Sequence, residues 1–329
     1  MNEKIVVIGS NSFSGSNFVN YGLKKGADVI GISRSQEPNE VFLPYKKQKN
    51  SNFLFHKLDL NHDTDRIVKI IRDFRTDYVV NFAAQAMVAQ SWQYPEHWFQ
   101  TNTVATVKLH DELRRCEFLK KYVHISTPEV YGNCSSLIQE NTAYNPSTPY
   151  AVSRAAADMS LKTFFDNYNF PVVFTRAANV YGSGQQLYRI IPRTIFYFLT
   201  GRKLQLHGGG KSIRSFIHIR DVADATLKAA RIGSGGEIFH FATERNITVR
   251  ALVEMIAKKM NVSFEDNVEV AEDRPGKDSA YLLDASKAKR ALDWEDIISL
   301  EAGIKETIQW VKGNLEILKR QSPEYVHKQ

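Results

Sequence analysis

Several features that would assign a chain to a particular class are scarce or missing here. Only two cysteines occur among 329 residues, Cys116 and Cys134, and they form neither a metal-binding spacing nor a disulfide framework. No apolar run is long enough to span a bilayer, and the residues from Met1 to Lys4 lack the pattern of a signal peptide. We therefore expect a cytoplasmic protein with no membrane segment and no metal site.

A strong charge imbalance is also absent. The formal net charge is +7, from 43 Lys and Arg against 36 Asp and Glu, and the basic residues are not interleaved with aromatics in a stripe. This pattern predicts no nucleic-acid partner. A modest basic excess does suit a small polyanionic substrate, such as a nucleotide diphosphate.

Short apolar runs alternate with helical patterns through the first half of the chain. Buried strands separated by helices are typical of a parallel sheet that is covered on both faces. We therefore expect an α/β fold with a doubly wound, Rossmann-type parallel sheet. The expected strands are 5–8, 29–32, 53–58, 78–82, 122–125 and 172–174, and the main expected helices are 63–74, 98–113 and 150–168.

After residue 176 the strict alternation ends, which indicates a smaller C-terminal substrate-binding lobe that closes over the cleft of the first domain. Thr248 predicts the N-cap of a helix that runs to about Met260, another helix is expected over about 300–319, and the polar end, 322–329, is expected to fray. The expected division is 1–176, with a returning segment at about 216–242, for the first domain, and 177–215 with 243–329 for the lobe.

A glycine-bearing turn, residues 9–15, joins the first expected strand to the first helix. Such a turn lets backbone N–H groups and a helix N-terminus meet a pyrophosphate. Ser12 stands where the pattern G-x-x-G-x-x-G has its middle glycine, and its hydroxyl can add a contact to a phosphate. Taken alone, the motif also fits a plain strand–helix turn. The residues expected to bind a dinucleotide here are Gly9, Ser12, Phe13, Ser14 and Gly15.

Residues at the ends of the following strands extend this dinucleotide site. Arg34 follows Ser33 just beyond the second strand, where an acid would hold a ribose 2′-hydroxyl and an arginine tolerates a 2′-phosphate. No acid lies there, so the local chemistry favours NADP. The other expected contacts are Asp59 and Leu60 for the adenine, and Ala83, Ala84 and Gln85 for the nicotinamide ribose.

A candidate catalytic group follows the fifth strand and begins the helix at 150–168. Tyr150 and Arg154 share one helical face, and a cation beside a phenol favours the phenolate, so Tyr150 can act as a base near neutral pH. The Thr127 hydroxyl can share the proton of a substrate hydroxyl. The alternative interpretation of Tyr150 is a half-buried helix aromatic.

These motifs together resemble the extended short-chain dehydrogenase/reductase superfamily, and specifically its NAD-dependent epimerase/dehydratase branch. The resemblance implies NAD rather than the NADP that Arg34 favours, and we expect NAD with NADP as the alternative. It also implies that Asn102, Tyr150 and Arg154 contribute to the cofactor site. It further implies that the helices 98–113 and 150–168 of two subunits form a homodimer through a four-helix bundle. It extends over 9–15, 81–91, Asn102, 126–132, 150–158, 176–182, 214–221 and 274–278.

The resemblance further implies a nucleotide-sugar site, with a UDP-sugar as substrate. Arginine forks can hold phosphate oxygens bidentately, an asparagine can hydrogen-bond a phosphate or the base, and leucines at 204–206 can line a flat uracil slot. Without the motifs, each of these arginines would be read as a surface charge. The expected substrate contacts are Gln85, Ser91, Pro128, Asn179, Arg189, Leu206, Arg214, Arg274 and Asp278.

Three departures from the family pattern bear on the reaction. Arg154 stands where lysine is usual; it keeps the charge but cannot release a proton. Pro128 stands where the 4,6-dehydratases have an aspartic acid that protonates the C6 hydroxyl, while Glu129, the base at C5, is retained. Gln85 and Met87 replace polar or charged residues, which suggests an altered substrate pocket.

The combination resembles the Pal-type enzymes of bacterial pseudaminic acid synthesis, which receive a 5,6-ene and so need no acid at C6. We therefore expect conversion of UDP-6-deoxy-GlcNAc-5,6-ene to UDP-4-keto-6-deoxy-L-AltNAc. Tyr150, aided by Thr127 and Arg154, would take the C4 hydroxyl proton, and Glu129 would transfer protons at C5 and C6. The alternatives are a stand-alone UDP-GlcNAc 4,6-dehydratase, a C4 epimerase or 4-keto reductase, and a non-catalytic dinucleotide-binding sensor.

Overall fold

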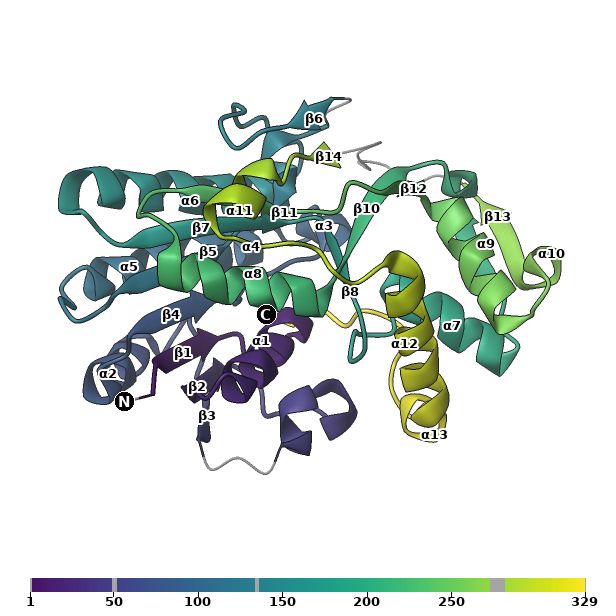
Figure 1. Ribbon diagram of the computed structural model, residues 1–329, viewed down its shortest axis with the longest axis horizontal. Helices are drawn as coiled ribbons and strands as arrows, with labels where there is room; N and C mark the ends of the chain where they lie inside the picture. The colour runs from purple at the N-terminus through teal and green to yellow at the C-terminus, as the bar shows by residue number, and fades with distance from the viewer. Residues whose placement is uncertain (1, 49–51, 134–135, 273–281, 329) are drawn as a thin grey trace.

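A seven-stranded parallel sheet forms the centre of the computed structural model, which describes residues 2–48, 52–133, 136–272 and 282–328 (Figure 1). The strand order is β11-β7-β5-β4-β1-β2-β3, so the expected doubly wound α/β fold is confirmed. The bounds are β1 Lys4–Ile8, β2 Asp28–Ser33, β3 Phe53–Lys57, β4 Tyr78–Asn81, β5 Lys121–Ile125, β7 Val172–Ala177 and β11 Ile238–Phe241.

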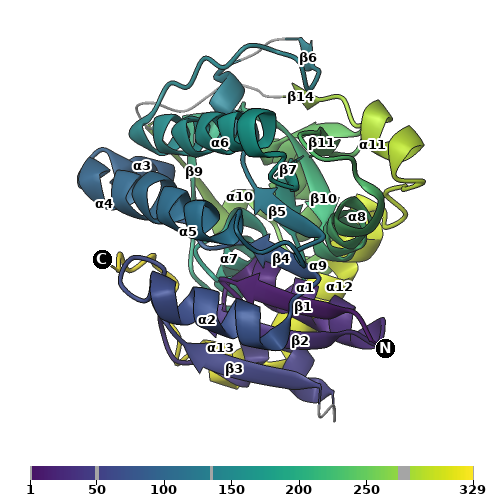
Figure 2. The ribbon, with the colours of Figure 1, turned by 90° about the vertical axis from the view of Figure 1, so that its left-hand side faces the viewer.

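Helices cover both faces of this sheet (Figure 2). Helices α1 and α8 pack together on one face, while α2, α5 and α6 lie side by side on the other. The central strands therefore lose contact with water on both sides, and Ile5, Val6 and Val7 of β1 are fully buried. The bounds are α1 Phe13–Lys24, α2 Thr64–Phe74, α3 Val88–Ser91, α4 Pro95–Phe99, α5 Thr106–Leu113, α6 Pro149–Tyr168 and α8 Ile219–Ile232.

The order in which strands are added reverses at β1. Strands β2 and β3 extend the sheet to one side of β1, and β4, β5 and β7 extend it to the other, with all strands parallel. Open α/β sheets bind their ligands at the carboxyl ends of the strands beside such a switch point. The fold thus places the glycine turn after β1 and the loop after β4 at the edge of one crevice.

The second lobe has its own apolar core, in which Ile195, Phe196, Leu252 and Ile304 are buried. It is joined to the first domain by the three-stranded sheet β12-β10-β8 and borders the crevice (Figure 1). The remaining bounds are β6 Leu137–Ile138, β8 Asn179–Tyr181, α7 Ile190–Thr200, β9 Leu204–His207, β10 Ile213–His218, β12 Asn246–Thr248, α9 Val249–Met260, α10 Phe264–Asn267, β13 Val268–Ala271, β14 Leu282–Leu283, α11 Ser286–Ala291, α12 Leu300–Gly313 and α13 Leu315–Leu318.

Several local expectations can be compared with these elements. The Thr248 hydroxyl accepts a hydrogen bond from Ala251 N at 3.1 Å, which confirms the predicted N-cap of α9. The helix expected over 98–113 instead contains a π-helical turn at Gln100–Ala105, between α4 and α5. The last expected helix is interrupted at Asn314, between α12 and α13.

The expected fraying of the C-terminal end is wrong for the residues that the structure describes, because 322–328 run along the crevice and contact both of its sides. Within the described parts of the chain, no helix is long and apolar enough to cross a membrane.

Candidate cofactor site and active site

The turn after β1 has the shape that its glycines predict. Gly9 has a φ of +84°, and a Cβ atom there would lie 2.7 Å from Ala83 N and 2.8 Å from Phe82 C. Gly9 N also donates to Ile32 O at 2.7 Å. The turn is therefore held against the ends of both β2 and β4, a close approach that only glycine permits.

The Ser12 side chain has a different role from the expected one. Its hydroxyl donates to Gly9 O at 2.7 Å and accepts from Gly15 N at 3.0 Å, so it caps helix α1. This corrects the expected phosphate contact, because the hydroxyl is engaged within the turn. Phe13 is also turned inward, 7% exposed and packed in an apolar cluster with Val130.

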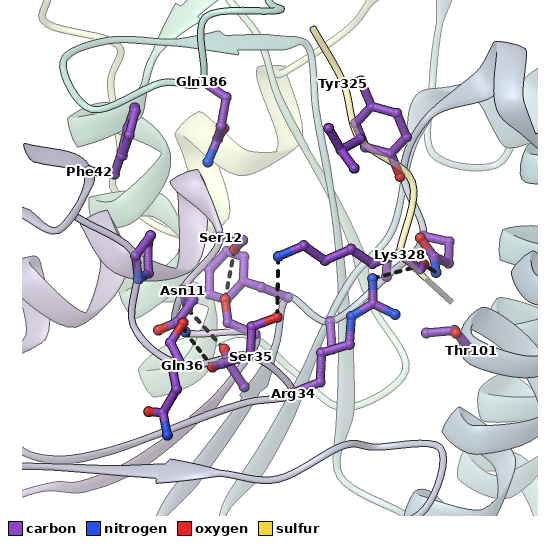
Figure 3. A pocket seen from close by; sticks show the side chains of 18 of the residues that line it. Asn11, Ser12, Arg34, Ser35, Gln36, Phe42, Thr101, Gln186, Tyr325 and Lys328 are labelled. Carbon is purple, nitrogen blue, oxygen red and sulfur yellow. Dashed lines mark hydrogen bonds between the residues drawn. The ribbon is translucent and has the colours of Figure 1, made fainter. Parts of the chain in front are cut away.

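A cavity of about 460 Å³ lies along the carboxyl ends of β1, β2, β3 and β4 (Figure 3). Its size is within the range of small-molecule sites. Its wall contains nine of the residues expected to bind a dinucleotide: Gly9, Ser12, Ser33, Arg34, Asp59, Leu60, Ala83, Ala84 and Gln85. Phe13, Ser14, Gly15, Asn102, Tyr150 and Arg154 were also expected to bind the cofactor, and they are not part of this wall.

Sequence reasoning missed other lining residues. Asn11, in the glycine turn, donates through Nδ2 to Ser35 O at 2.9 Å and Gln36 O at 3.1 Å, which fixes the loop after β2. These three residues neighbour predicted ones, so their positions in the sequence could have indicated them. Tyr188 and the end of the chain also line the cavity, and no local pattern links them to it.

Asn102 acts on the cavity through Gln85 rather than directly. Its Oδ1 accepts from Gln85 N at 2.8 Å, and its Nδ2 donates to Gln85 O at 3.0 Å and to Ser153 Oγ at 3.0 Å. Both N–H groups of this fully buried amide are thus used within the protein. Asn102 therefore positions the loop after β4 against helix α6.

The predicted catalytic residues Thr127, Glu129 and Tyr150 do lie together. Thr127 caps a short 3₁₀ turn, Pro128–Tyr131, by accepting from Glu129 N at 3.3 Å, and its side chain hydrogen-bonds with Tyr150. Burial raises the pKa of Tyr150 above its usual value, and the nearby Glu129 charge raises it further.

Arg154 and Arg189 act on Tyr150 in the opposite sense. Their positive charges lower its pKa, as the sequence predicts for Arg154, but they do not outweigh burial and Glu129. The expectation of a phenol made acidic by a neighbouring guanidinium is therefore wrong for the protein without ligands. Tyr150 is a neutral phenol at pH 7 in this state.

Arg154 is 2% exposed, and it is directed beneath strand β5. Its Nη2 donates to Ile125 O and lies 3.2 Å from His124 Nε2. Its Nε has no hydrogen-bond partner among the residues that the structure describes. A buried guanidinium N–H without a partner costs free energy, and this cost is offset in part by the contacts of Nη2 with β5.

A buried ionic network continues from Arg154. The Asp158 carboxylate accepts from Ser126 Oγ at 2.6 Å and from Arg176 Nη2 at 2.8 Å, and it lies 3.4 Å from His124 Nε2. Burial lowers the pKa of His124 well below its usual value, so this ring is neutral. Two guanidiniums and one carboxylate leave a surplus positive charge behind the active site, which favours an anionic species there.

Several residues expected to bind the sugar nucleotide lie in different parts of the structure. Gln85 lines the cavity, and Arg189 precedes α7, near enough to Tyr150 for its charge to act on it. Ser91 is buried in α3 and donates to Val88 O at 2.6 Å. Leu206 is 2% exposed in the core of the second lobe.

Two further candidates, Asn179 and Arg214, bond to nearby main chain. Asn179 Nδ2 donates to Ser215 O at 3.3 Å, and Arg214 Nη1 donates to Ile213 O at 2.8 Å. Arg274 and Asp278 lie outside the described residues.

Fold and site define a dinucleotide-binding α/β protein with a Thr, Glu and Tyr group next to the cofactor cleft. The sequence profile of the GDP-mannose 4,6 dehydratase family matches residues 6–307, and the chain belongs to this family. The expected membership of the epimerase/dehydratase branch is thereby confirmed.

Similar proteins agree with this assignment. A dTDP-glucose 4,6-dehydratase of Xanthomonas campestris is 30% identical, with 94% of this chain and 93% of the relative covered. A crystal structure of the dTDP-glucose 4,6-dehydratase of Streptomyces venezuelae, with NAD bound, has a TM-score of 0.88 at 27% identity, over 95% of this chain and 98% of that one. The UDP-glucuronic acid 4-epimerase of Bacillus cereus, in complex with NAD, has a TM-score of 0.86 at 26% identity, over 94% and 99%.

Proposed function

We propose that this chain is an NAD-dependent nucleotide-sugar 4,6-dehydratase, which oxidises C4 of the sugar transiently and removes water across C5 and C6. The contact of Thr127 with Tyr150, within reach of the Glu129 charge, carries the proposal. The printed activities of the relatives and NAD in the neighbouring structures support it.

The residues present fit a dinucleotide. The cavity has the size of a small-molecule site, and Gly9 lets the turn lie against the end of β4, where nine of the residues expected to bind a dinucleotide line the wall. Gly9, Arg34 and Asp59 would hold the cofactor along the cavity wall. When bound, NAD supplies a hydride acceptor and later returns the hydride.

The side chains divide the proton transfers. Tyr150 takes the C4 hydroxyl proton, and Thr127 hydrogen-bonds the same oxygen. Glu129 removes the proton at C5, which the C4 ketone makes acidic. The carboxyl that has taken this proton is itself an acid, so Glu129 can pass it to the departing C6 hydroxyl, which leaves as water. Reduction of the resulting C5–C6 double bond would then need a proton at C5, which Glu129 would deliver after taking one from solvent. Glu129 would then serve both as the base at C5 and as the acid at C6, a role that the Pro128 side chain cannot fill.

Pro128 also supports a second candidate. An enzyme that receives UDP-6-deoxy-GlcNAc-5,6-ene from a separate dehydratase needs no acid at C6, and Glu129 would then protonate the sugar to form UDP-4-keto-6-deoxy-L-AltNAc. Both candidates use Tyr150 and Thr127. In the first this chain removes the water, and in the second a separate dehydratase has already removed it.

Incubation with UDP-GlcNAc, GDP-mannose and dTDP-glucose separates these candidates. The dehydratase converts one of them to a 4-keto product lighter by one water, detected by mass spectrometry, and incorporates solvent deuterium. Conversion of the 5,6-ene alone, with all three intact sugars unchanged, would favour the second candidate. A 4-epimer without water loss would favour the epimerase alternative, and no turnover of any of these would favour a sensor.

Two variants test the site itself. A Glu129→Gln protein should still reduce bound NAD on adding substrate but should release no dehydrated product. Normal turnover by that variant would remove Glu129 from the mechanism. Mass spectrometry of the nucleotide released on denaturation distinguishes NAD from NADP, which Arg34 keeps as the alternative.

A homodimer through α4, α5 and α6 is also proposed. Apolar side chains on these helices and on the π-helical turn between α4 and α5 are partly open to solvent, with 37% of Phe99, 41% of Val104, 39% of Val152 and 60% of Met159 exposed. Pairing of two such faces would bury them in a four-helix bundle. Sedimentation analysis should show a dimer that Met159→Glu weakens, and a wild-type monomer would contradict it.

A further inference from the structure

The last residues of the chain cross the mouth of the cofactor cavity. We propose that the segment 322–328 is a working part of the dinucleotide site, a strap that closes the cavity and slows the release of bound cofactor. This inference rests on the proposed dinucleotide binding. The segment 322–328 contains no helix or strand, so its side-chain and main-chain contacts hold it in place.

One end of the strap is fixed to the second lobe. Arg193 Nη2 donates to Pro323 O at 2.9 Å and to Glu324 Oε2 at 2.8 Å. The Tyr325 ring then stands edge-on to Tyr188, with 5.4 Å between the ring centroids. Arg193 lies on α7, so this half of the strap is attached to the substrate lobe.

The other end is fixed to the first domain. The His327 ring stacks on Trp98 of α4 at 5.1 Å and on Tyr94 at 5.3 Å. Lys328 O accepts from Gln85 Nε2 at 2.7 Å and from Arg34 Nη2 at 3.2 Å. The strap therefore bridges the two sides of the crevice and ends on two predicted cofactor residues.

The strap forms one wall of the cavity and sends one side chain across it. Tyr325 and Lys328 line the cavity, and Lys328 Nζ reaches to 3.5 Å from Ser35 Oγ, while its main-chain oxygen contacts Arg34 (Figure 3). The space of about 460 Å³ lies between this wall and the turn. A dinucleotide in that space would be covered by the strap, so it could leave only after contacts with at least one side had broken.

Retention of the cofactor has a chemical reason in the proposed reaction. The same nicotinamide must accept a hydride from the sugar and return it, so a cofactor lost in mid-cycle would leave an oxidised sugar behind. A strap that is anchored on both sides of the crevice would keep the cofactor bound until the hydride has been returned.

The test compares the intact chain, a chain that ends at Gln321, and a Tyr325→Ala, His327→Ala double variant. Each is loaded with NADH, and release is followed by the loss of NADH fluorescence after a chase with excess NAD. We expect release at least tenfold faster from both altered proteins. Lys319→Ala serves as the control, because Lys319 is exposed and pairs with Glu316 just before the strap.

Equal or slower release from the altered proteins would overturn the strap, and tighter NADH binding would show that the segment obstructs the site instead. Circular dichroism and thermal unfolding establish that each protein is folded, and the double variant decides the matter if the truncated chain does not fold. An intact chain that binds neither NADH nor NADPH would refute the proposed dinucleotide binding itself, which is a separate outcome.

Discussion

Tyr150 is subject to opposing influences, and their balance decides when it can act as a base. Burial and the Glu129 carboxylate keep the phenol protonated, whereas Arg154 and Arg189 favour the phenolate. A reaction at neutral pH therefore needs a further contribution when the cleft is occupied. The exclusion of water from an occupied cleft would strengthen the effect of the Arg154 and Arg189 charges.

The sign of each influence can be tested by titration. Glu129→Gln should lower the pKa of Tyr150, because it removes a negative charge that opposes ionisation. Arg154→Met should raise it, because it removes a favourable positive charge. Ultraviolet difference absorbance of the phenolate measures both, and Tyr150→Phe identifies the signal. Shifts in the opposite directions would contradict the electrostatic account.

The amide of Asn102 should matter for both stability and cofactor binding. Asn102→Ala leaves Gln85 N–H and C=O without their buried partners, which costs about 1–3 kcal/mol of unfolding free energy per unsatisfied group. Urea unfolding measures this loss, and NAD binding should weaken as the loop after β4 shifts. Asn167→Ala, at an exposed position of α6, is the control and should change stability by no more than about 0.5 kcal/mol. A loss of unfolding free energy no larger than in the control would contradict a stabilising role of the hydrogen bonds between Asn102 and Gln85.

At the scale of elements, the periodic parts of the chain were predictable and the irregular parts were not. The central strands of the first half, such as β1 and β4, are apolar runs buried on both faces, so their pattern identifies them without tertiary information. Strand β11 is a short run within the returning segment, and its pairing with β7 depends on contacts distant in sequence. The π-helical turn at Gln100–Ala105 likewise has no pattern of apolar residues that would predict it from the sequence.

The candidate site divides in the same way. Residues at strand ends, such as Arg34 and Asp59, were predictable because the carboxyl ends of parallel strands meet at one edge. The role of Ser12 was mistaken, because a hydroxyl that could face a phosphate can equally cap its own helix. Tyr325 and Lys328 were missed, because a polar chain end carries no sign of where it packs.

The close approach of the glycine turn to β4 predicts a large effect of one methyl group. Gly9→Ala combines a φ of +84° with a Cβ only 2.7 Å from Ala83 N. Gly26→Ala has nearly the same φ, +82°, but no atom within 4 Å, so it isolates the cost of the backbone conformation. We expect about 1 kcal/mol of lost unfolding free energy for Gly26→Ala, and about 1–3 kcal/mol more for Gly9→Ala. Equal losses in urea unfolding would mean that the turn can move away from β4.

At the scale of the whole molecule, several histidines are buried as neutral rings, although they would be protonated in water at low pH. Burial lowers the pKa of His110 and His218 to about 4 and that of His240 to about 3, and it lowers the pKa of His124 as well. Asp221 acts in the opposite sense, because burial raises its pKa to about 6. The folded protein thus resists the uptake of protons that the unfolded chain accepts.

This resistance fixes the direction of the pH dependence of stability. A histidine whose folded pKa is depressed stabilises the fold above the unfolded pKa of about 6.5, and the contribution is lost as pH falls toward the folded pKa. Each such histidine contributes a slope of about 1.4 kcal/mol per pH unit in that window. Asp221 titrates in the opposite sense and offsets about one histidine, so the net slope should stay positive between pH 6 and pH 4 and exceed the share of a single histidine.

Urea unfolding at a series of pH values from 7.5 to about 4.5 would measure this slope. His110→Gln should reduce it by about one histidine's share, whatever its effect on stability at pH 7.5, since only one titrating group is removed. Added salt should change the slope little, because burial rather than repulsion between surface charges causes the shifts. A stability that stays constant down to pH 5, or a slope that salt abolishes, would show that net charge and not these buried rings governs the response to acid.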